Sequence, residues 1–103
     1  MMRDRGQKYI LNNQHVPIAV PDDDEWWEWY NIEKNRRVGE DHIGDIVIST
    51  VFTAWDITPD RCLFETMVFG GRYDRECWRT HTWEEAEAKH KEIVAVIEAE
   101  HKS

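Results

Sequence analysis

The chain has 103 residues, of which 41% are hydrophobic, and it carries six tryptophans and a formal net charge of −8. These values predict a single folded domain spanning residues 1–103 and exclude a disordered chain. No apolar run is long enough to cross a bilayer, and the opening MMRDRGQKYI lacks the apolar segment of a secretory signal. We therefore expect neither membrane insertion nor export.

The excess negative charge lies in two segments. Residues 22–35 hold six acidic side chains and one basic one, residues 82–103 hold six and three, and the acids and bases of the remaining residues balance. Such a distribution disfavours nucleic acid and anionic membranes as partners. It favours a partner protein with a basic surface, or it simply keeps the chain in solution, because solvated helices are often acidic.

The first third of the chain predicts a loose end, a hairpin and a helix. Residues 1–7 are polar, and residues 8–20 are typical of two short strands that turn at Asn12–Asn13, with Pro17 at a sheet edge. In residues 21–35, Asp22 or Asp23 is expected to cap a helix. The predicted inner face of this helix is broad and aromatic, and consists of Trp26, Trp29, Tyr30 and Glu33, with Trp27 at its flank.

The middle of the chain predicts strands. Residues 36–56 indicate a weak strand, a turn near Gly44–Asp45, and a strong strand over 46–55. Both faces of that strand are largely apolar, which is typical of a central strand covered on both sides. A turn at 57–61 leads to an antiparallel strand over 62–69, which Gly70–Gly71 end through a positive φ. Residues 72–79 are a candidate for a further strand.

The last segment predicts an amphipathic helix from the capping box Thr82–Glu85 to about Lys102. Its predicted inner face consists of Trp83, Ala86, His90, Ile93, Val94 and Ile97. The predicted fold is α+β, an antiparallel sheet of about four to five strands with two helices in the order ββ-α-βββ(β)-α. If both helices pack on one face of the sheet, the other face has to meet the hairpin or a second copy, so a homodimer is one arrangement to test.

The stretch LFETMVFGG (63–71) carries candidate ligand chemistry. Glu65 lies among apolar neighbours and needs a cationic partner, for which the following arginines are nearest in sequence. Those arginines and the two glycine N–H groups could also hold a phosphate, and a tryptophan could stack on a base. The predicted site for a small anionic, nucleotide-like ligand therefore comprises Trp55, Glu65, Gly70, Gly71, Arg72, Arg75, Trp78 and Arg79. The plain alternative is that the glycines form an ordinary turn and that Glu65 is a salt-bridged carboxylate at the sheet rim.

Other reactive side chains match no known motif. An acid–base or metal-dependent enzyme would draw on Glu65, His81 and His90, but their spacing fits neither a catalytic nor a metal-binding pattern. His90 is better interpreted as a hydrogen-bonded core histidine. Cys62 and Cys77 are expected to be reduced packing thiols. We predict no catalytic residue, no metal ligand and no cofactor.

Several blocks resemble a family of small proteins encoded by tailed bacteriophages and prophages. These blocks are YIL with VP (9–17), IGDIVISTVF (43–52) followed by Asp56, LFETMVFGG (63–71) and TWEEAEAKH (82–90), so the similarity runs from Tyr9 to about His90. The chain departs from the family pattern at Ile57, where the family often has a histidine, and in its short loop at 57–61. The family has no established activity. The resemblance therefore implies phage origin and a setting in the host cytoplasm, and it transfers no catalytic residue.

These observations favour a non-enzymatic phage protein that binds and blocks a host protein with a basic surface, a mode of action that would serve counter-defence. The residues predicted to carry this function are acids on the outer faces of the two helices, Asp23, Asp24, Glu28, Glu84, Glu87 and Glu98. The alternatives are the binder of an anionic ligand described above, a minor virion component, and a metal-dependent enzyme.

Overall fold

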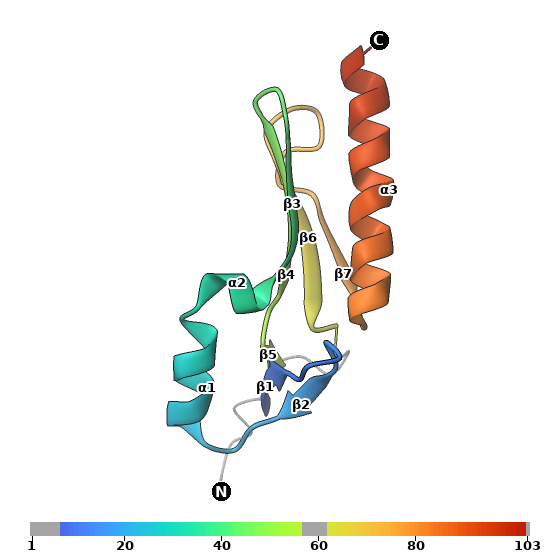
Figure 1. Cartoon of the computed structure of the whole chain (residues 1–103). Coiled ribbons are helices and arrows are strands. Elements are labelled where there is room, and N and C mark those ends of the chain that lie inside the picture. Colours follow the sequence, from blue (N-terminus) through green and yellow to red (C-terminus); the bar gives the residue numbers. More distant parts are fainter. Residues whose placement is uncertain (1–6, 57–61, 103) are drawn as a thin grey trace, which may run out of the picture.

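The computed structural model describes residues 7–56 and 62–102. Within these ranges the chain forms three helices and seven strands in two antiparallel sheets, which confirms the predicted α+β class (Figure 1). The predicted turn at 57–61 and residues 1–6 of the predicted loose end lie outside the described residues. Gln7, which was assigned to that end, is instead the first residue of a strand.

A small sheet forms at the N-terminal end of the molecule. Strands β1 (Gln7–Leu11), β2 (Pro17–Ala19) and β5 (Trp55–Asp56) are arranged in the order β2-β1-β5. The hairpin predicted over residues 8–20 is thus confirmed. Pro17 lies on an edge strand as predicted, where its missing N–H removes no ladder bond.

A larger sheet forms the body of the molecule. Its strands are β3 (Arg37–Ile43), β4 (Ile46–Phe52), β6 (Phe64–Phe69) and β7 (Cys77–Thr80), arranged in the order β3-β4-β6-β7. β4 is therefore a central strand, as its apolar sequence predicted. Its partners are antiparallel throughout.

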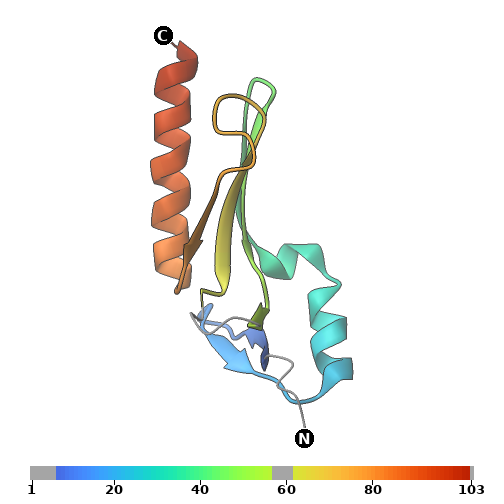
Figure 2. The ribbon, with the colours of Figure 1, turned by 180° about the vertical axis from the view of Figure 1, so that it is seen from behind.

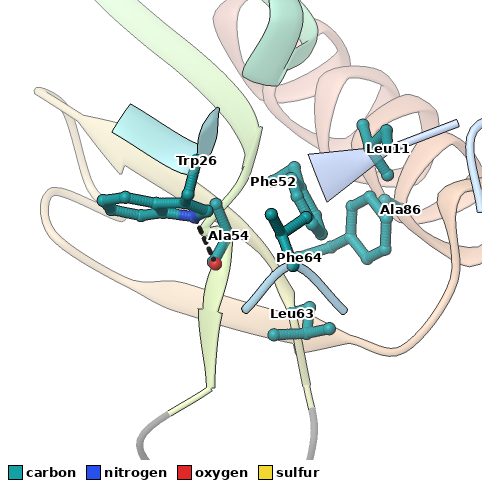
Figure 3. Close-up of a cluster of buried hydrophobic side chains, with 8 residues drawn as sticks. Leu11, Trp26, Phe52, Ala54, Leu63, Phe64 and Ala86 are labelled. Carbon is teal, nitrogen blue, oxygen red and sulfur yellow. Dashed lines mark hydrogen bonds between the residues drawn. The ribbon is translucent and has the colours of Figure 1, made fainter. Parts of the chain in front are cut away.

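Ala54 separates the two sheets. The strand predicted over 46–55 stops at Phe52, because Ala54 adopts a φ of 68° and turns the chain into β5. The fully buried Ala54 also supplies a carbonyl oxygen that accepts from the Tyr9 N–H at 2.8 Å and from Trp26 Nε1 at 3.1 Å. Figure 3 shows the indole of Trp26 directed at this oxygen. These bonds tie the hairpin and the first helix to the end of β4.

The helix predicted over residues 21–35 is two helices, α1 (Asp23–Tyr30) and α2 (Glu33–Arg36). Asp22 caps α1 as predicted, since its side chain accepts from the N–H groups of the following turn. The break falls at Ile32, which is extended at φ −89° and ψ 101°. Two side chains satisfy carbonyls freed at the end of α1, because Asn35 donates to Trp29 O and Arg36 donates to Tyr30 O. Consequently Glu33, which was predicted on the inner face, is exposed and pairs with Arg37 at 2.9 Å.

The last helix, α3 (Trp83–Lys102), has the predicted bounds and the predicted inner face. Thr82 accepts from the Glu85 N–H at 3.1 Å, which is one arm of the predicted capping box. The return arm reaches one residue further back, because the Glu85 carboxylate accepts from the N–H of His81 at 2.9 Å.

The candidate strand over 72–79 begins only at Cys77. The preceding residues form a turn in which Gly70, Gly71 and Arg75 all have positive φ angles, of 95°, 70° and 69°. Gly70 and Gly71 thus end β6 as predicted. A Cβ at Gly71 would also meet Ile46 Cδ1 at 2.7 Å, so that side chain would have to shift, and the positive φ favours glycine there in any case.

Only one face of the larger sheet is covered by the described helices. α3 packs along the face that carries three fully buried cross-strand pairs, Ile48–Val68, Thr50–Thr66 and Phe52–Phe64. On the other face, Val47, Ser49, Val51, Glu65 and Met67 are half-buried and Phe69 is exposed. The expectation that β4 is covered on both sides is therefore wrong, because α1 packs on β1 and the hairpin end instead of crossing the sheet.

The resulting molecule is elongated, with extents of 55 × 30 × 21 Å. Figure 2 shows the same arrangement from behind, with α3 along the sheet and α1 at the hairpin end. Its radius of gyration is 15.2 Å, against about 13 Å for a compact domain of this length. Among the described residues, no helix combines the length and the apolar character that crossing a membrane requires.

Candidate functional site

The outer surface of α1 carries unpaired carboxylates beside an exposed aromatic ring. Asp24 and Glu28 are exposed and make no ion pair within the described residues, whereas Asp23 pairs with Lys8 at 3.0 Å. Trp27 lies between them in sequence and is 55% exposed. The acids predicted on this helix are thus mostly available to a partner.

A series of stacked rings connects the buried ring of Trp26, through Tyr30, to the exposed ring of Trp27. Trp27 stacks on Tyr30 at a centroid distance of 6.0 Å and an angle of 12°, and Tyr30 stacks on Trp26 at 4.6 Å. Arg36 covers Tyr30 at 4.2 Å. Because Trp26 is anchored by its bond to Ala54, the exposed indole is held in position before any partner binds.

On α3 the acids divide into paired and unpaired groups. Glu84, Glu87 and Glu98 are exposed and make no ion pair within residues 7–56 and 62–102. The other acids of this helix face groups of the chain itself. They are Glu85 with His81, Glu92 with Lys89, and Glu100 with Arg72 and Tyr73. All six predicted acids are therefore exposed, and within the part of the chain that the structure describes only Asp23 is neutralised by a nearby cation.

The residues predicted to bind an anionic ligand do not meet at one place. Trp55 lies at the hairpin end, where its ring meets Trp26 and Lys8. Trp78 pairs with Thr66 and faces α3, whereas Arg79 pairs with Glu65 on the uncovered face. Arg75 is 86% exposed and lies 3.9 Å from Asp74.

The backbone at Gly70 and the cation at Arg72 already have partners in the chain. The Gly70 N–H donates to the Asp74 carboxylate at 2.6 Å, and Arg72 lies 3.5 Å from Glu100. Gly70, Arg72 and Glu100 share the lining of a pocket of about 170 Å³ at the C-terminal end of α3. The Tyr73 hydroxyl donates to Glu100 at 2.6 Å, and this bond raises the pKa of Tyr73. An anion entering the pocket would have to displace or adjoin the Glu100 carboxylate.

Glu65 faces an arginine across the β6–β7 ladder, but it makes no ion pair within the described residues, so the predicted salt bridge is not formed. It is half-buried on the uncovered face and lies directly opposite Arg79 in the β6–β7 ladder. It also accepts a hydrogen bond from the Cys77 thiol. Burial of the sulfur, followed by this bond, raises the pKa of Cys77 to about 11, although the residue as a whole is exposed.

A hydrogen-bonded chain crosses the buried face of the larger sheet. Thr66 Oγ1 lies 2.7 Å from Thr50 Oγ1, Thr50 Oγ1 lies 2.7 Å from His90 Nδ1, and His90 Nε2 lies 2.7 Å from Asp41. Because an ionised carboxylate only accepts, the proton belongs on His90 Nε2 and the neutral ring accepts from Thr50 at Nδ1. The Thr50 oxygen in turn accepts from Thr66. His90 is therefore the core histidine that the sequence predicted.

This chain repeats the order of groups in a hydrolase triad, but it is sealed. The hydroxyls belong to residues with no exposed surface, so a substrate cannot reach them. The enzyme alternative would also need Glu65, His81 and His90 together. The structure places Glu65 on the uncovered face, His90 under α3, and His81 before the first turn of α3.

A contact that the sequence reasoning missed joins Cys62 to His81. Cys62 Sγ lies 3.3 Å from His81 Nε2, and His81 Nδ1 lies 3.6 Å from Glu85 Oε1. The β6–β7 register explains the contact. Phe64 pairs with Thr80, and this pair brings Cys62 and His81, which lie just beyond it, close together. No group of three or more potential metal ligands is found among the described residues.

Comparison of the chain with protein-family models, curated proteins and solved structures gives no match.

Proposed function

We propose that this chain is a non-enzymatic binding protein that holds a basic protein surface against α1. In the phage setting that the resemblance implies, the partner is a host protein and the role is to block it, as counter-defence requires. The observation that carries the proposal is the exposed, pre-positioned Trp27 between Asp24 and Glu28, whose carboxylates make no ion pair among the described residues.

An aromatic ring next to carboxylates suits an arginine or lysine of a partner. The cation can lie over the indole face while its N–H groups donate to a carboxylate, and both interactions strengthen when the partner excludes water. Tryptophan is also the residue type most enriched among interface residues that dominate affinity. The ring contacts that hold Trp27 reduce the entropy that binding would otherwise cost.

The acids of α3 have a different part in this proposal. Glu84, Glu87 and Glu98 lie on an exposed helix without an exposed aromatic anchor next to them. They add to the negative field that speeds encounter with a basic partner, an effect that salt screens. We therefore assign the contact itself to α1 and long-range attraction to α3.

The test is capture from host lysate with the folded chain and matched variants. Trp27→Ala is expected to weaken binding of the captured protein by about 30-fold or more, the size of a dominant interface residue. Asp24→Lys with Glu28→Lys should abolish capture. Val96→Ala removes a side chain of comparable exposure from α3 and should leave capture unchanged.

Charge reversal on α3 separates the two roles. Glu84→Lys with Glu87→Lys should slow association at low salt and leave the dissociation rate unchanged. If the α1 variants capture the same proteins as the unaltered chain, the proposal is wrong. Native mass spectrometry of protein purified from infected cells distinguishes this proposal from the anionic-ligand alternative, because a co-purifying nucleotide would favour that alternative.

A further inference from the structure

The two cysteines have different ionisable neighbours, because Cys62 lies beside a histidine and Cys77 lies beside a carboxylate whose effect on the thiol pKa is only partly offset by Arg79. Cys62 lies against the imidazole of His81, and the backbone carbonyl of Cys62 accepts from Arg79 Nη2 at 3.1 Å. Cys77 instead donates its thiol proton to the carboxylate of Glu65. Exposure alone would predict the reverse order of reactivity, because Cys77 is exposed and Cys62 is only half-exposed.

The start of α3 positions His81 so that its imidazole can accept the thiol proton of Cys62. The Glu85 carboxylate, fixed by the helix cap, accepts from the His81 N–H at 2.9 Å, and the same oxygen lies 3.6 Å from Nδ1. A carboxylate on that side favours the tautomer with its proton on Nδ1 and leaves Nε2 free to accept the thiol proton. Cysteine, histidine and carboxylate thus stand in the order found where a thiol acts as a nucleophile.

We propose that Cys62 is a reactive thiol that undergoes thiol–disulfide exchange with small disulfides, with His81 as its proton acceptor and Glu85 as the residue that positions His81. This inference is independent of the binding function proposed for α1.

The exchange step needs no other reactant. The proton on Cys62 Sγ moves to His81 Nε2, and the thiolate attacks one sulfur of a disulfide R–S–S–R. A bond forms between Cys62 Sγ and that sulfur, the S–S bond of the reagent breaks, and the leaving thiolate takes the proton from His81. One disulfide is consumed and one mixed disulfide is formed.

The mixed disulfide on Cys62 would not be resolved by Cys77. Cys77 pairs with Met67 in the ladder, five residues along from Cys62, which at about 3.4 Å per residue puts the two cysteines roughly 17 Å apart. A disulfide needs Cα atoms within about 7 Å. The product is therefore expected to persist as a modified Cys62.

The experiment uses the reduced, folded chain with oxidised glutathione or 5,5′-dithiobis(2-nitrobenzoate) as the probe, and peptide mass mapping to assign the site. At neutral pH, Cys62 is expected to react at least about tenfold faster than Cys77, because the thiolate is the reacting species. The rate at Cys77 should rise only as the pH approaches the value of about 11 at which its thiol ionises. In denaturant both cysteines should react alike, which shows that the difference comes from the fold.

The variants distinguish a histidine-assisted thiol from one that is merely accessible. His81→Gln should slow Cys62 and move its pH–rate profile to higher pH, whereas Glu85→Gln should do so to a smaller degree. Glu65→Gln should speed Cys77 and leave Cys62 unchanged. Circular dichroism checks that each variant is folded. The proposal is overturned if Cys77 reacts first in the folded chain, or if His81→Gln leaves both the rate and the pH profile of Cys62 as they were.

Discussion

The two faces of the larger sheet are built from similar side chains but differ in burial. One face carries isoleucine, valine, phenylalanine and threonine with no exposed surface, and it is covered by α3. The other carries valine, methionine and phenylalanine together with Glu65 and Arg79, and no described helix packs on it. Strand alternation produced two faces suited to burial, and the placement of one helix decided which of them became the core.

The covered face also shows how a core accommodates polar groups. Thr50 and Thr66 lie between an aromatic pair and an aliphatic pair, and they divide the core into two apolar clusters (Figure 3 shows the aromatic one). Their hydroxyls are satisfied by each other and by His90. A buried hydroxyl without such partners would cost roughly 1–3 kcal/mol.

The largest effect is expected on the covered face, at Phe52. This side chain is fully buried and contacts Phe64 and Trp29, so Phe52→Ala should lower the free energy of unfolding by about 3–5 kcal/mol. Phe69→Ala is the matched control on the uncovered face, where the ring is 46% exposed. Denaturant titration measures both, and equal losses would contradict the difference between the faces.

A smaller effect is expected within the polar layer. Thr50→Val keeps the shape but leaves His90 Nδ1 and Thr66 without their partner, so it should cost about 1–3 kcal/mol. Thr66→Val leaves the bond from Thr50 to His90 intact and should cost less. The two unfolding titrations compare these variants directly, and a larger loss for Thr66→Val would contradict the direction assigned to the chain.

Gly39→Ala probes the same network from the opposite strand. A Cβ at Gly39 would lie 3.2 Å from the His90 ring, so the ring has to shift and its bonds to Thr50 and Asp41 lengthen. We expect a loss of about 1 kcal/mol, at the low end for overpacking. Thermal unfolding measures it, and Gly39→Ala placed in a His90→Ala background should cost nothing if the clash is with the ring.

The smallest effect on the free energy of unfolding is expected on the uncovered face. This face is also where a homodimer interface is predicted, and that prediction is still to be tested. The charged side chains there include Glu65 and Arg79, which lie opposite each other, so a two-fold axis could place each against its counterpart in a second copy. Met67 is half-buried, and a lysine there can extend its charged end to solvent, so Met67→Lys should lower the free energy of unfolding of the monomer by less than about 1 kcal/mol. Sedimentation equilibrium should show self-association of the unaltered chain and its loss in this variant, with Val96→Lys on α3 as the control. A chain that stays monomeric at every concentration would contradict the dimer.

Sequence patterns alone determined the features that depend on near neighbours in the chain. Asp22 and Thr82 cap helices, Gly70 ends a strand with a positive φ, and the alternation in β4 marks a central strand. Each rests on interactions within a few residues, or on a periodicity that can be read directly from the sequence.

Only the tertiary structure decided what depends on distant partners. The Ala54 carbonyl accepts from both Tyr9 and Trp26, which lie far from it in the sequence, and the link from His90 to Asp41 joins residues 49 positions apart. The meeting of Cys62 with His81 likewise required the strand register and the start of α3. Local patterns specify which elements form, but the docking of whole elements specifies which side chains meet, because packing and pairing are set between segments that the sequence keeps far apart.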